Sequence, residues 1–445
     1  MKLRVALFSV SALAFTAHAD GLVIVGGSPR AIGRAGTGTV GDDGGGALLL
    51  DPAAMARRDS ARGQVGVTYI DDGIDWRSDL GSNAPIVHDQ IGSLAMPTVS
   101  VEDGYAGWVF GIGAMTSAIS DRQLRRVDSS GQANAFDYRY AGIGGGVRRD
   151  TVVVGAARRI GDHVAVGASI AASHVTVAET RRVWAGFSGT DALGSPNDDV
   201  QLELAATDRF SPSAVVGVLV APDAPIELAA SIGWERDAHA SGTVFGFGST
   251  NAQVRVPNDA ASIVLPQPVT ARAGVRYLAD RYVVECDGDL FVFGSGSTSN
   301  TWSLAGVDVT NTGTQATMTS LVSRFAPRTH AAFRTSVDVA LIGGFLWATA
   351  GYAYTTEGTP EADYTPTVAD LGGHTIGVGI EAHAGGFTVT LGASRTWSGA
   401  IDVASPAWNL DNPLGKGDEH VAPGDFAAVT TQFGVMLDAE LDAPR

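Results

Sequence analysis

Residues 333–341 read FRTSVDVAL, and apolar and polar side chains alternate along this stretch. One face takes every second residue from Phe333 to Leu341 and is mostly apolar, while the other face carries Arg334 and Asp338. Successive side chains of a β-strand point to opposite faces. One apolar face opposite a polar or small face is typical of a transmembrane β-barrel strand. The stretch therefore predicts a barrel strand whose apolar side contacts lipid.

The same alternation recurs along the chain. It is found at 164–170, 284–292, 376–383 and 387–394. In residues 284–292, Cys286 falls on the face that carries valine and leucine, while Glu285, Asp287 and Asp289 fall on the other. The pattern therefore predicts that Cys286 faces lipid and that three carboxylates face the lumen.

Composition excludes several other classes. The chain has 445 residues with 57 Gly, and 30 Lys+Arg against 47 Asp+Glu give a formal net charge of −17. This charge argues against nucleic-acid binding, which needs clustered cations. A soluble β-sandwich would also alternate, but its polar faces normally carry lysine, and Lys416 is the only lysine beyond residue 19. No repeat of fixed period is evident, which argues against a solenoid or a propeller. An all-β transmembrane barrel is favoured.

Residues 1–19 have the parts of a bacterial secretory signal peptide. Lys2 and Arg4 precede an apolar core, and an A-x-A cleavage site ends at Ala19. The core is about half the roughly 20 residues that a spanning helix needs. The nearest later candidate, 339–354, is interrupted by a Gly-Gly pair that suits a hairpin turn. We therefore expect export by a cleaved signal peptide, and an exported membrane chain without spanning helices must form a closed barrel.

The alternating runs between residues 61 and 441 number about fourteen, and single-chain bacterial barrels have an even number of strands. Residues 442–445 are then a short C-terminal tail. Long connections are expected at 119–133, 184–210, 296–325 and 403–425, which are rich in Pro, Gly, Asn and Asp and include Trp184, Trp302 and Trp408. The expected strands are 61–71, 87–101, 105–118, 134–158, 162–182, 211–221, 225–247, 260–279, 281–295, 326–342, 345–357, 371–385, 386–402 and 426–441.

Residues 20–60 do not alternate, so they are not expected in the barrel wall. They contain Gly33-Arg34-Ala35, then Asp42-Asp43, then Asp51-Pro52-Ala53. This order resembles the start of the outer-membrane long-chain fatty acid and hydrocarbon transporter family, the FadL-like proteins. Further similar motifs follow in the family's order. They are 106–113 (AGWVFGIG), Leu265-Pro266, Gly274-Val275, Tyr277, Asp280-Arg281, Glu285-x-Asp287, and Pro360, Asp370 and His374. The resemblance covers nearly all of the chain after residue 19.

The resemblance implies that residues 20–60 form a small plug inside the barrel. Arg34, Asp42 and Asp43 would then be enclosed, and buried charges need partners. We expect them to anchor the plug by pairing with each other or with wall residues such as Arg334. Asp51 and Pro52 belong to the plug tripeptide, where the family usually has Asn in place of Asp51.

Two further groups of residues are candidates for contact with a ligand. Leu22, Val23, Ile24 and Val25 are the best apolar candidates for a binding pocket. In the family, a kink in the third strand opens the wall sideways, and Gly111 and Gly113 lie in the strand that resembles it. Glycine within a strand can also mark a bend or simple close packing.

Other chemistry is not favoured. Residues 22–33 (LVIVGGSPRAIG) imitate a phosphate-binding glycine turn, but no βαβ unit follows. The nine His are scattered without metal-ligand spacing, and no Ser-His arrangement indicates a hydrolase. We therefore expect no enzyme activity, catalytic residue, metal or other cofactor.

The sequence thus favours passive uptake of hydrophobic small molecules, either long-chain fatty acids or hydrocarbons, across an outer membrane. The expected partners are the ligand and outer-membrane lipid, with no nucleic acid and no protein partner implied. The alternatives that stay open are a structural or adhesive barrel and a general polar porin.

Overall fold

The computed structural model of the chain describes residues 28–42, 44–57, 60–78, 91–123, 139–140, 142–187, 196–294, 300–323, 327–360, 363–365, 367, 370–403, 409–414, 418–420 and 424–441. The expected signal peptide, residues 22–25, Asp43, Trp408 and the tail at 442–445 lie outside these residues.

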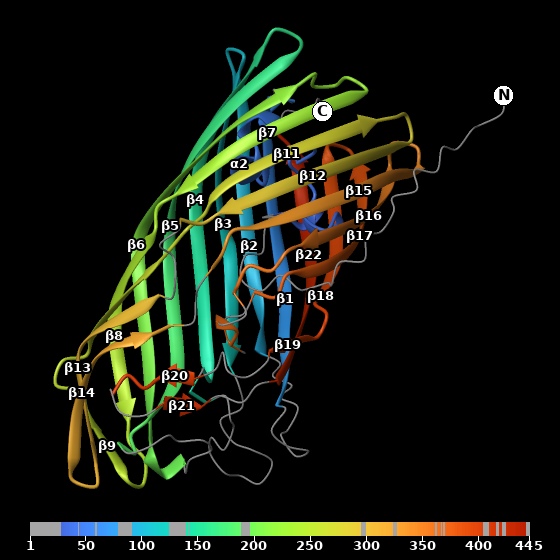
Figure 1. Ribbon diagram of the computed structural model, residues 1–445. Coiled ribbons are helices and arrows are strands. Elements are labelled where there is room, and N and C mark those ends of the chain that lie inside the picture. Colours follow the sequence, from blue (N-terminus) through green and yellow to red (C-terminus); the bar gives the residue numbers. More distant parts are fainter. Residues whose placement is uncertain are drawn as a thin grey trace.

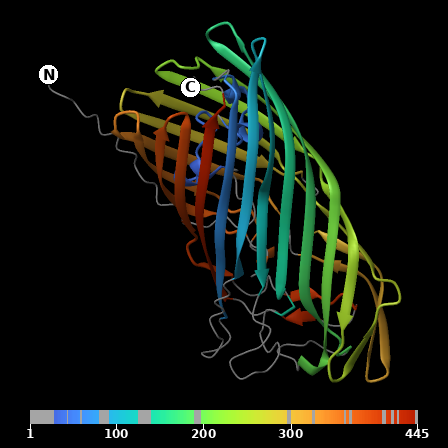
Figure 2. The ribbon, with the colours of Figure 1, turned by 180° about the vertical axis from the view of Figure 1, so that it is seen from behind.

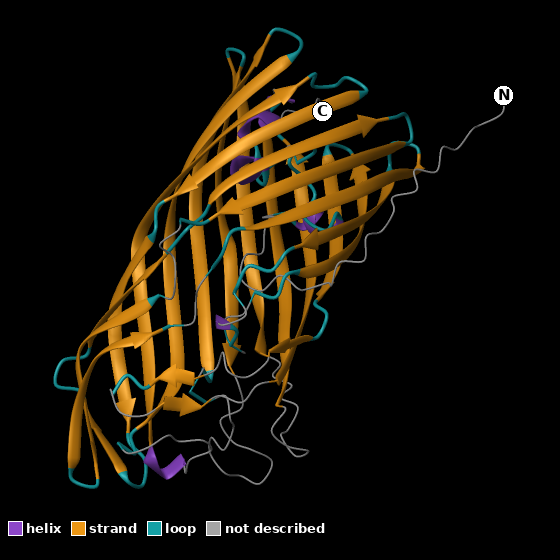
Figure 3. Cartoon of the chain, in the orientation of Figure 1, coloured by secondary structure: helices purple, strands orange, loops and turns teal. Residues whose placement is uncertain are grey.

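Almost all of the described chain is strand (Figures 1 and 3). The strands are β1 (Arg62–Ser78), β2 (Ile91–Tyr105), β3 (Trp108–Gln123), β4 (Gly144–Ile160), β5 (Val164–Trp184), β6 (Asp199–Val220), β7 (Ile226–Glu235), β8 (Ala238–Phe247), β9 (Ala252–Arg255), β10 (Ala260–Leu265), β11 (Val269–Leu278), β12 (Tyr282–Val292), β13 (Thr301–Asn311), β14 (Thr314–Val322), β15 (His330–Ile342), β16 (Leu346–Thr355), β17 (Gly373–Ala384), β18 (Phe387–Trp397), β19 (Ile401–Val403), β20 (Asn409–Asp411), β21 (Asp418–His420) and β22 (Gly424–Glu440).

Several of these strands are segments of one longer wall strand. β7 and β8 both pair with β6, while β11 pairs with β7 and β10 with β8, so β7–β8 and β9–β11 each count once. The pairs β12–β13, β14–β15 and β18–β19 are continuous in the same way. The wall therefore has 14 antiparallel strands. Pairing of β1 with β22, from Arg62 opposite Glu440 to Ser78 opposite Gly424, closes the barrel.

The two faces of the wall confirm the predicted alternation. Large apolar side chains on the outside are highly exposed, such as Phe333, Val378 and Phe433, whereas Arg334 and Asp338 are buried inside. Along β12, Glu285, Asp287 and Asp289 are buried and point inward, and Cys286 takes the outward register. An apolar outer band and a polar interior define a barrel that spans a membrane.

No helix in the described parts of the chain is long and apolar enough to cross a membrane.

Two expected connections are strands in the structure. Residues 199–210 form the first half of β6, and residues 301–322 form β13 and β14, so the predictions of loops there are wrong. In β13 the side chains of Trp302, Leu304, Val307 and Val309 are buried while Ser303 is exposed. The apolar residues face inward here, which is the reverse of the membrane-facing segments. This end of the barrel therefore projects beyond the apolar outer band.

Residues 28–57, called the inner segment below, lie within the barrel near one end (Figures 1 and 2). They form helix α1 (Pro29–Gly33), helix α2 (Ala47–Leu50) and a 3-10 helix η1 (Pro52–Arg57). Ser28 caps α1 by accepting the Ala31 N–H, and Pro29 at the first helical position has no N–H to satisfy. The helix α1 packs against β16, β17, β18, β22 and β1, whereas η1 packs against β3 to β6. The inner segment therefore reaches both sides of the lumen.

Candidate functional site: the inner segment and the lumen

Two wall carboxylates hold the turn that follows α1. Asp287 Oδ2 accepts the backbone N–H groups of Gly38 and Thr39 at 2.8 and 2.9 Å. Glu285 Oε1 accepts those of Val40 and Gly41 at 2.8 and 2.9 Å. The two acids lie two residues apart on the inner face of β12. Four consecutive backbone donors are thereby fixed to one wall strand.

Arginines of the inner segment make ion pairs with three other wall strands. Arg34 pairs with Asp338 on β15, and its Nε donates to Asp338 Oδ1 at 3.1 Å. Arg30 Nε lies 3.0 Å from Glu381 Oε2 on β17. On the other side of the lumen, Arg57 pairs with Glu227 on β7. The side chains of Arg34 and Asp338 are almost fully buried, so loss of one partner would leave an uncompensated charge.

Arg34 and Asp42 were both expected to make anchoring ion pairs, but their contacts differ in the structure. Arg34 pairs with the wall through Asp338, and Arg334 pairs instead with Asp289. Asp42 accepts hydrogen bonds within the inner segment, from Ser28 Oγ at 3.0 Å and from the Gly44 N–H at 3.3 Å. Asp42 therefore stabilises the fold of the segment and does not pair with Arg34.

Asp51 and Pro52 begin η1. Asp51 Oδ1 accepts the Ala53 N–H at 3.0 Å, as an N-cap residue does, and Pro52 follows at the first helical position. Asp51 is fully buried. Burial raises the pKa of its carboxyl to about 7, although the Ala53 hydrogen bond and the charges of Arg57 and Arg272 act in the opposite direction. This carboxyl, directly before η1, therefore has a pKa close to neutral pH.

The opposite side of the lumen, along β3 to β6, combines an apolar cluster with hydrogen bonds that Ser169 and Arg159 donate to carbonyls of the inner segment. Leu48 and Met55 of the inner segment belong to one buried cluster with Val109, Met115 and Val153 of the wall. A second buried apolar cluster fills the end of the barrel that projects beyond the outer band. It includes Val177, Leu202, Leu204, Val244, Ile263, Trp302, Val309 and Leu321. β5 and β6 run through both clusters, so these two strands connect them.

Backbone pairing between β2 and β3 covers only part of the length of the two strands. Their ladder runs from Tyr105 opposite Trp108 to Thr98 opposite Met115 and ends there. Beyond this point β2 pairs only with β1, and β3 pairs only with β4 among the described residues. A register shift in β3 between Thr116 and Ala118 coincides with the end of the ladder. A bulge of this kind bends a strand away from its neighbour.

Met115 places this interruption beside the apolar side of the lumen. Its side chain is buried and belongs to the same cluster as Leu48 and Met55. Thr116 Oγ1 donates to Asp150 Oδ1 on β4 at 2.7 Å, which ties β3 to β4 where it leaves β2. The ladder therefore ends at the edge of the apolar cluster.

Gly111 and Gly113 lie within intact pairing on both sides of β3. Gly111 is opposite Glu102 and Gly155, and Gly113 is opposite Ser100 and Val153. An added Cβ at Gly111 would lie 3.0 Å from Met55 Sδ and 3.2 Å from Leu48 Cδ2. At this position glycine gives the inner segment room, and a role of these two residues in a lateral opening stays a prediction.

Sequence reasoning missed several of these contacts. Glu285 and Asp287 were predicted to face the lumen, but the four backbone donors that they accept are not visible as a side-chain pattern. Glu381 lies on the polar face of the predicted alternation at 376–383, and Glu227 alternates with apolar residues in the same way, a signal that could have identified it as a lumen carboxylate. No group of three or more His, Cys, Asp or Glu among the described residues could hold a metal ion.

This geometry defines the class of protein: a closed barrel of 14 strands that encloses an N-terminal segment. No protein-family model and no curated protein matches the sequence. The structure is similar to that of a Pseudomonas aeruginosa FadL homologue, with a TM-score of 0.74 and 14% identity over 94% of this chain and 99% of that chain. It is also similar to the P. putida toluene transporter TodX, with a TM-score of 0.67 and 13% identity over 94% and 98% of the two chains.

A third similar structure is CymD, a monoaromatic hydrocarbon channel, with a TM-score of 0.59 and 13% identity over 94% of this chain and 98% of that chain. At such identities the likeness establishes the fold. The chain has the FadL-like fold, as its motifs predicted.

Proposed function

We propose that this protein is an outer-membrane channel for passive uptake of hydrophobic small molecules, either long-chain fatty acids or hydrocarbons. In this proposal the inner segment is a plug that occludes the lumen, and the ligand leaves sideways between β2 and β3. The observation that carries the proposal is the end of the β2–β3 ladder at Met115, beside the apolar side of the lumen. The FadL-like fold supports it, because the similar structures include a toluene transporter and a monoaromatic hydrocarbon channel.

Apolar ligands need such a route for a physical reason. Removing a methylene group from water is favourable by about 0.8 kcal/mol, so an apolar interior attracts these molecules strongly. A ligand released sideways moves from one apolar medium to another and is never rehydrated. Release through the open end of the barrel would require it to regain its water shell.

The interruption in the wall also needs a physical account. Unpaired backbone N–H and C=O groups in hydrocarbon cost several kcal/mol each. Pro97 on β2 has no N–H, and the register shift in β3 turns that strand toward β4. Both features lower the cost of an open edge at this place, which supports an opening maintained by the fold.

Substitution of Met115 tests the exit route. We expect Met115→Gln to reduce uptake of labelled oleate or toluene at least tenfold in cells without another transporter, because it places an amide in the apolar passage. The matched control is Met436→Gln on β22, a buried methionine equally far from solvent (both side chains about 5% exposed or less) and away from the interruption. Both variants must reach the membrane as folded barrels, shown by heat-modifiable gel migration.

Uptake that is equal in the two variants would refute an exit beside Met115. Purified protein should also bind a fatty acid or an apolar probe more tightly than a sugar. Equal weak binding of both, together with large steady conductance in planar bilayers, would favour the polar porin. Equal weak binding without conductance would favour a structural or adhesive barrel.

A further inference from the structure

Five neighbouring wall strands present glycines to α1. Gly379 on β17, Gly392 on β18 and Gly434 on β22 are direct partners across the ladder, so they form a row. Gly351 on β16 and Gly377 on β17 are also direct partners. Gly66 on β1 completes the set on the other side of β22.

The backbone of residues 29–35, which comprise α1 and the two residues after it, lies where side chains would project from four of these glycines. An added Cβ at Gly392 or Gly434 would lie within 3.0 Å of Pro29 atoms. At Gly377 it would lie 2.6 Å from Ala35 N, and at Gly351 within 3.0 Å of the Arg34 backbone. Real Cβ atoms essentially never approach so closely, so α1 and a side chain cannot both be present.

Backbone conformation does not require glycine at these positions. None of these glycines on β1, β16, β17, β18 and β22 has a positive φ. Glycine weakens a strand because it has no side chain to pack and is flexible when unfolded. Its use here is explained by the close approach of α1. η1 meets the opposite wall in the same way, since an added Cβ at Gly167 would lie within 3.0 Å of the Pro52 and Ala53 backbone.

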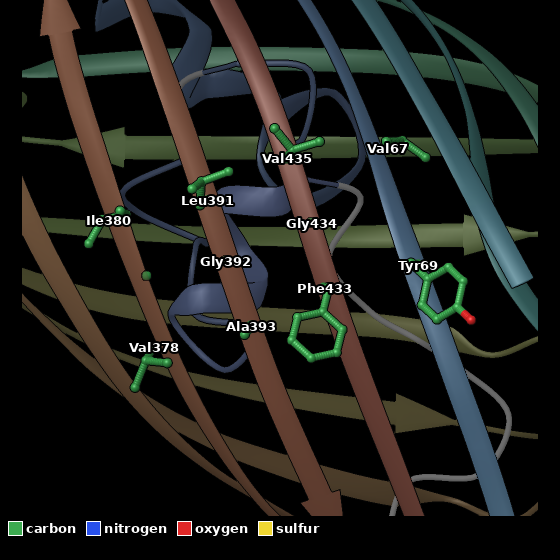
Figure 4. A pocket seen from close by; sticks show the side chains of 11 residues that line it. Val67, Tyr69, Val378, Ile380, Leu391, Gly392, Ala393, Phe433, Gly434 and Val435 are labelled. Carbon is green, nitrogen blue, oxygen red and sulfur yellow. The ribbon is translucent and has the colours of Figure 1, made fainter. Parts of the chain in front are cut away.

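The outer surface over the same glycines is hollow (Figure 4). A depression of about 580 Å³ lies over Gly379, Gly392 and Gly434, between apolar side chains such as Leu391 and Phe433. Figure 4 shows the row at Gly392 and Gly434 with the inner segment directly behind it. The wall between α1 and the membrane is here a single layer of backbone.

We propose that Gly351, Gly377, Gly392, Gly434 and Gly66 form a seat that fixes the position of α1 in the closed barrel. Ion pairs with long side chains can re-form over a range of positions, but a backbone-to-backbone contact allows only one. The pairs Arg30–Glu381 and Arg34–Asp338 lie at the two ends of α1 and hold it against the seat. The seat thus sets the place of the helix, and the charges retain it there. This inference rests on the proposed role of the inner segment as a plug.

The test measures exposure of α1 directly, in the full-length protein. Ala31, which is 2% exposed, is replaced by cysteine in a Cys286→Ser background, and the rate of maleimide labelling in liposomes is recorded. We expect Gly392→Ala and Gly434→Ala to raise that rate at least tenfold. Gly66→Ala should raise it less, since its Cβ would lie 3.2 Å from Pro29 Cγ, beside the Val435 carbonyl oxygen of the wall at 3.1 Å.

The matched control is Gly233→Ala on β7. Gly233 also faces the lumen, but its added Cβ would meet Val215 Cγ2 at 3.5 Å, Arg272 Nη1 at 3.8 Å and Ala214 O at 3.9 Å, which are ordinary contacts. Labelling of this variant should equal that of the parent. If Gly392→Ala does not fold, Gly434→Ala and the milder Gly66→Ala decide the question.

Unchanged labelling in folded Gly434→Ala and Gly66→Ala barrels would overturn the seat, and so would an equal rise in Gly233→Ala. Uptake is assayed separately on the same proteins. Labelling that rises in the seat variants of a protein that takes up no hydrophobic ligand would support the seat and refute the proposed transport. Normal uptake with unchanged labelling in the seat variants would support the proposed transport and refute the seat.

Discussion

Asp51 gives the sharpest physical test of how the inner segment is held. The change is Asp51→Asn, which removes the ionisable group and keeps the Oδ1 acceptor for the Ala53 N–H. Burial raises the pKa of Asp51 from 3.8 to about 7, and the residue lies outside the membrane-spanning strands. The shift is therefore about three pKa units, which corresponds to about 4 kcal/mol at 1.36 kcal/mol per unit.

The direction of the effect follows from proton binding. A raised carboxyl pKa means that the folded protein binds the Asp51 proton more tightly than the unfolded segment does. The free energy of unfolding therefore decreases as pH rises from about 4 to about 7 and is level above that. The Asp51→Asn variant has no such loss, because the amide does not titrate. We expect the hydrogen-exchange protection of the segment to agree within a few-fold between the two proteins at pH 4. At pH 8 the variant should be the more stable of the two.

Hydrogen exchange measured by mass spectrometry can follow residues 47–57 locally. After correction for intrinsic rates, protection of this segment at pH 8 should be up to about a thousandfold greater in Asp51→Asn, the factor equivalent to three pKa units. Peptides from β18 in the same samples serve as the internal control and should not change. Equal pH dependence of protection in the two proteins would refute the reasoning, as would lower protection of the variant at pH 8.

Two further predictions concern contacts of the inner segment. Arg34→Met should lower the free energy of unfolding by about 3–5 kcal/mol because it leaves Asp338 buried without its cation; Asp338→Asn in addition should recover part of the loss, as measured by urea unfolding in detergent micelles. Gly111→Val with Gly113→Val should insert and fold normally but lose uptake of oleate, because a side chain at Gly111 meets Met55; wild-type uptake by the intact barrel would contradict this.

The membrane-facing part of the fold could be predicted from sequence because lipid imposes a strict pattern. Each strand there must be apolar outside, so alternation in residues 333–341 and 284–292 located both faces correctly. The same reasoning did not identify the strands at 199–210 and 301–322. Outside the apolar band the outer face is solvated, so Trp302 and Leu204 point inward and the phase of the alternation is reversed.

The candidate site could be predicted only in part, for a different reason. Motif order located the inner segment and marked Arg34 as a buried charge, but the partner of Arg34 is 304 residues away on β15. The end of the β2–β3 ladder depends on which register two strands adopt and where one of them bulges. Glycine-rich strands specify register weakly, and β3 contains Gly111 and Gly113, so no local pattern predicted where the ladder ends.

Different wall strands contact the inner segment in different ways. The charged side, β12 to β17, supplies Glu285, Asp287, Asp338 and Glu381, and these acids hold the segment through directional bonds. The strands β3 to β6 contact it through Leu48 and Met55, and also through hydrogen bonds that Ser169 and Arg159 donate to its backbone carbonyls. Dispersion contacts are individually weak and can be exchanged for contacts with an apolar ligand at little cost. Among the described residues, the ion pairs of the segment lie on β7, β15 and β17, and the β2–β3 ladder ends on the side of the lumen that lacks them.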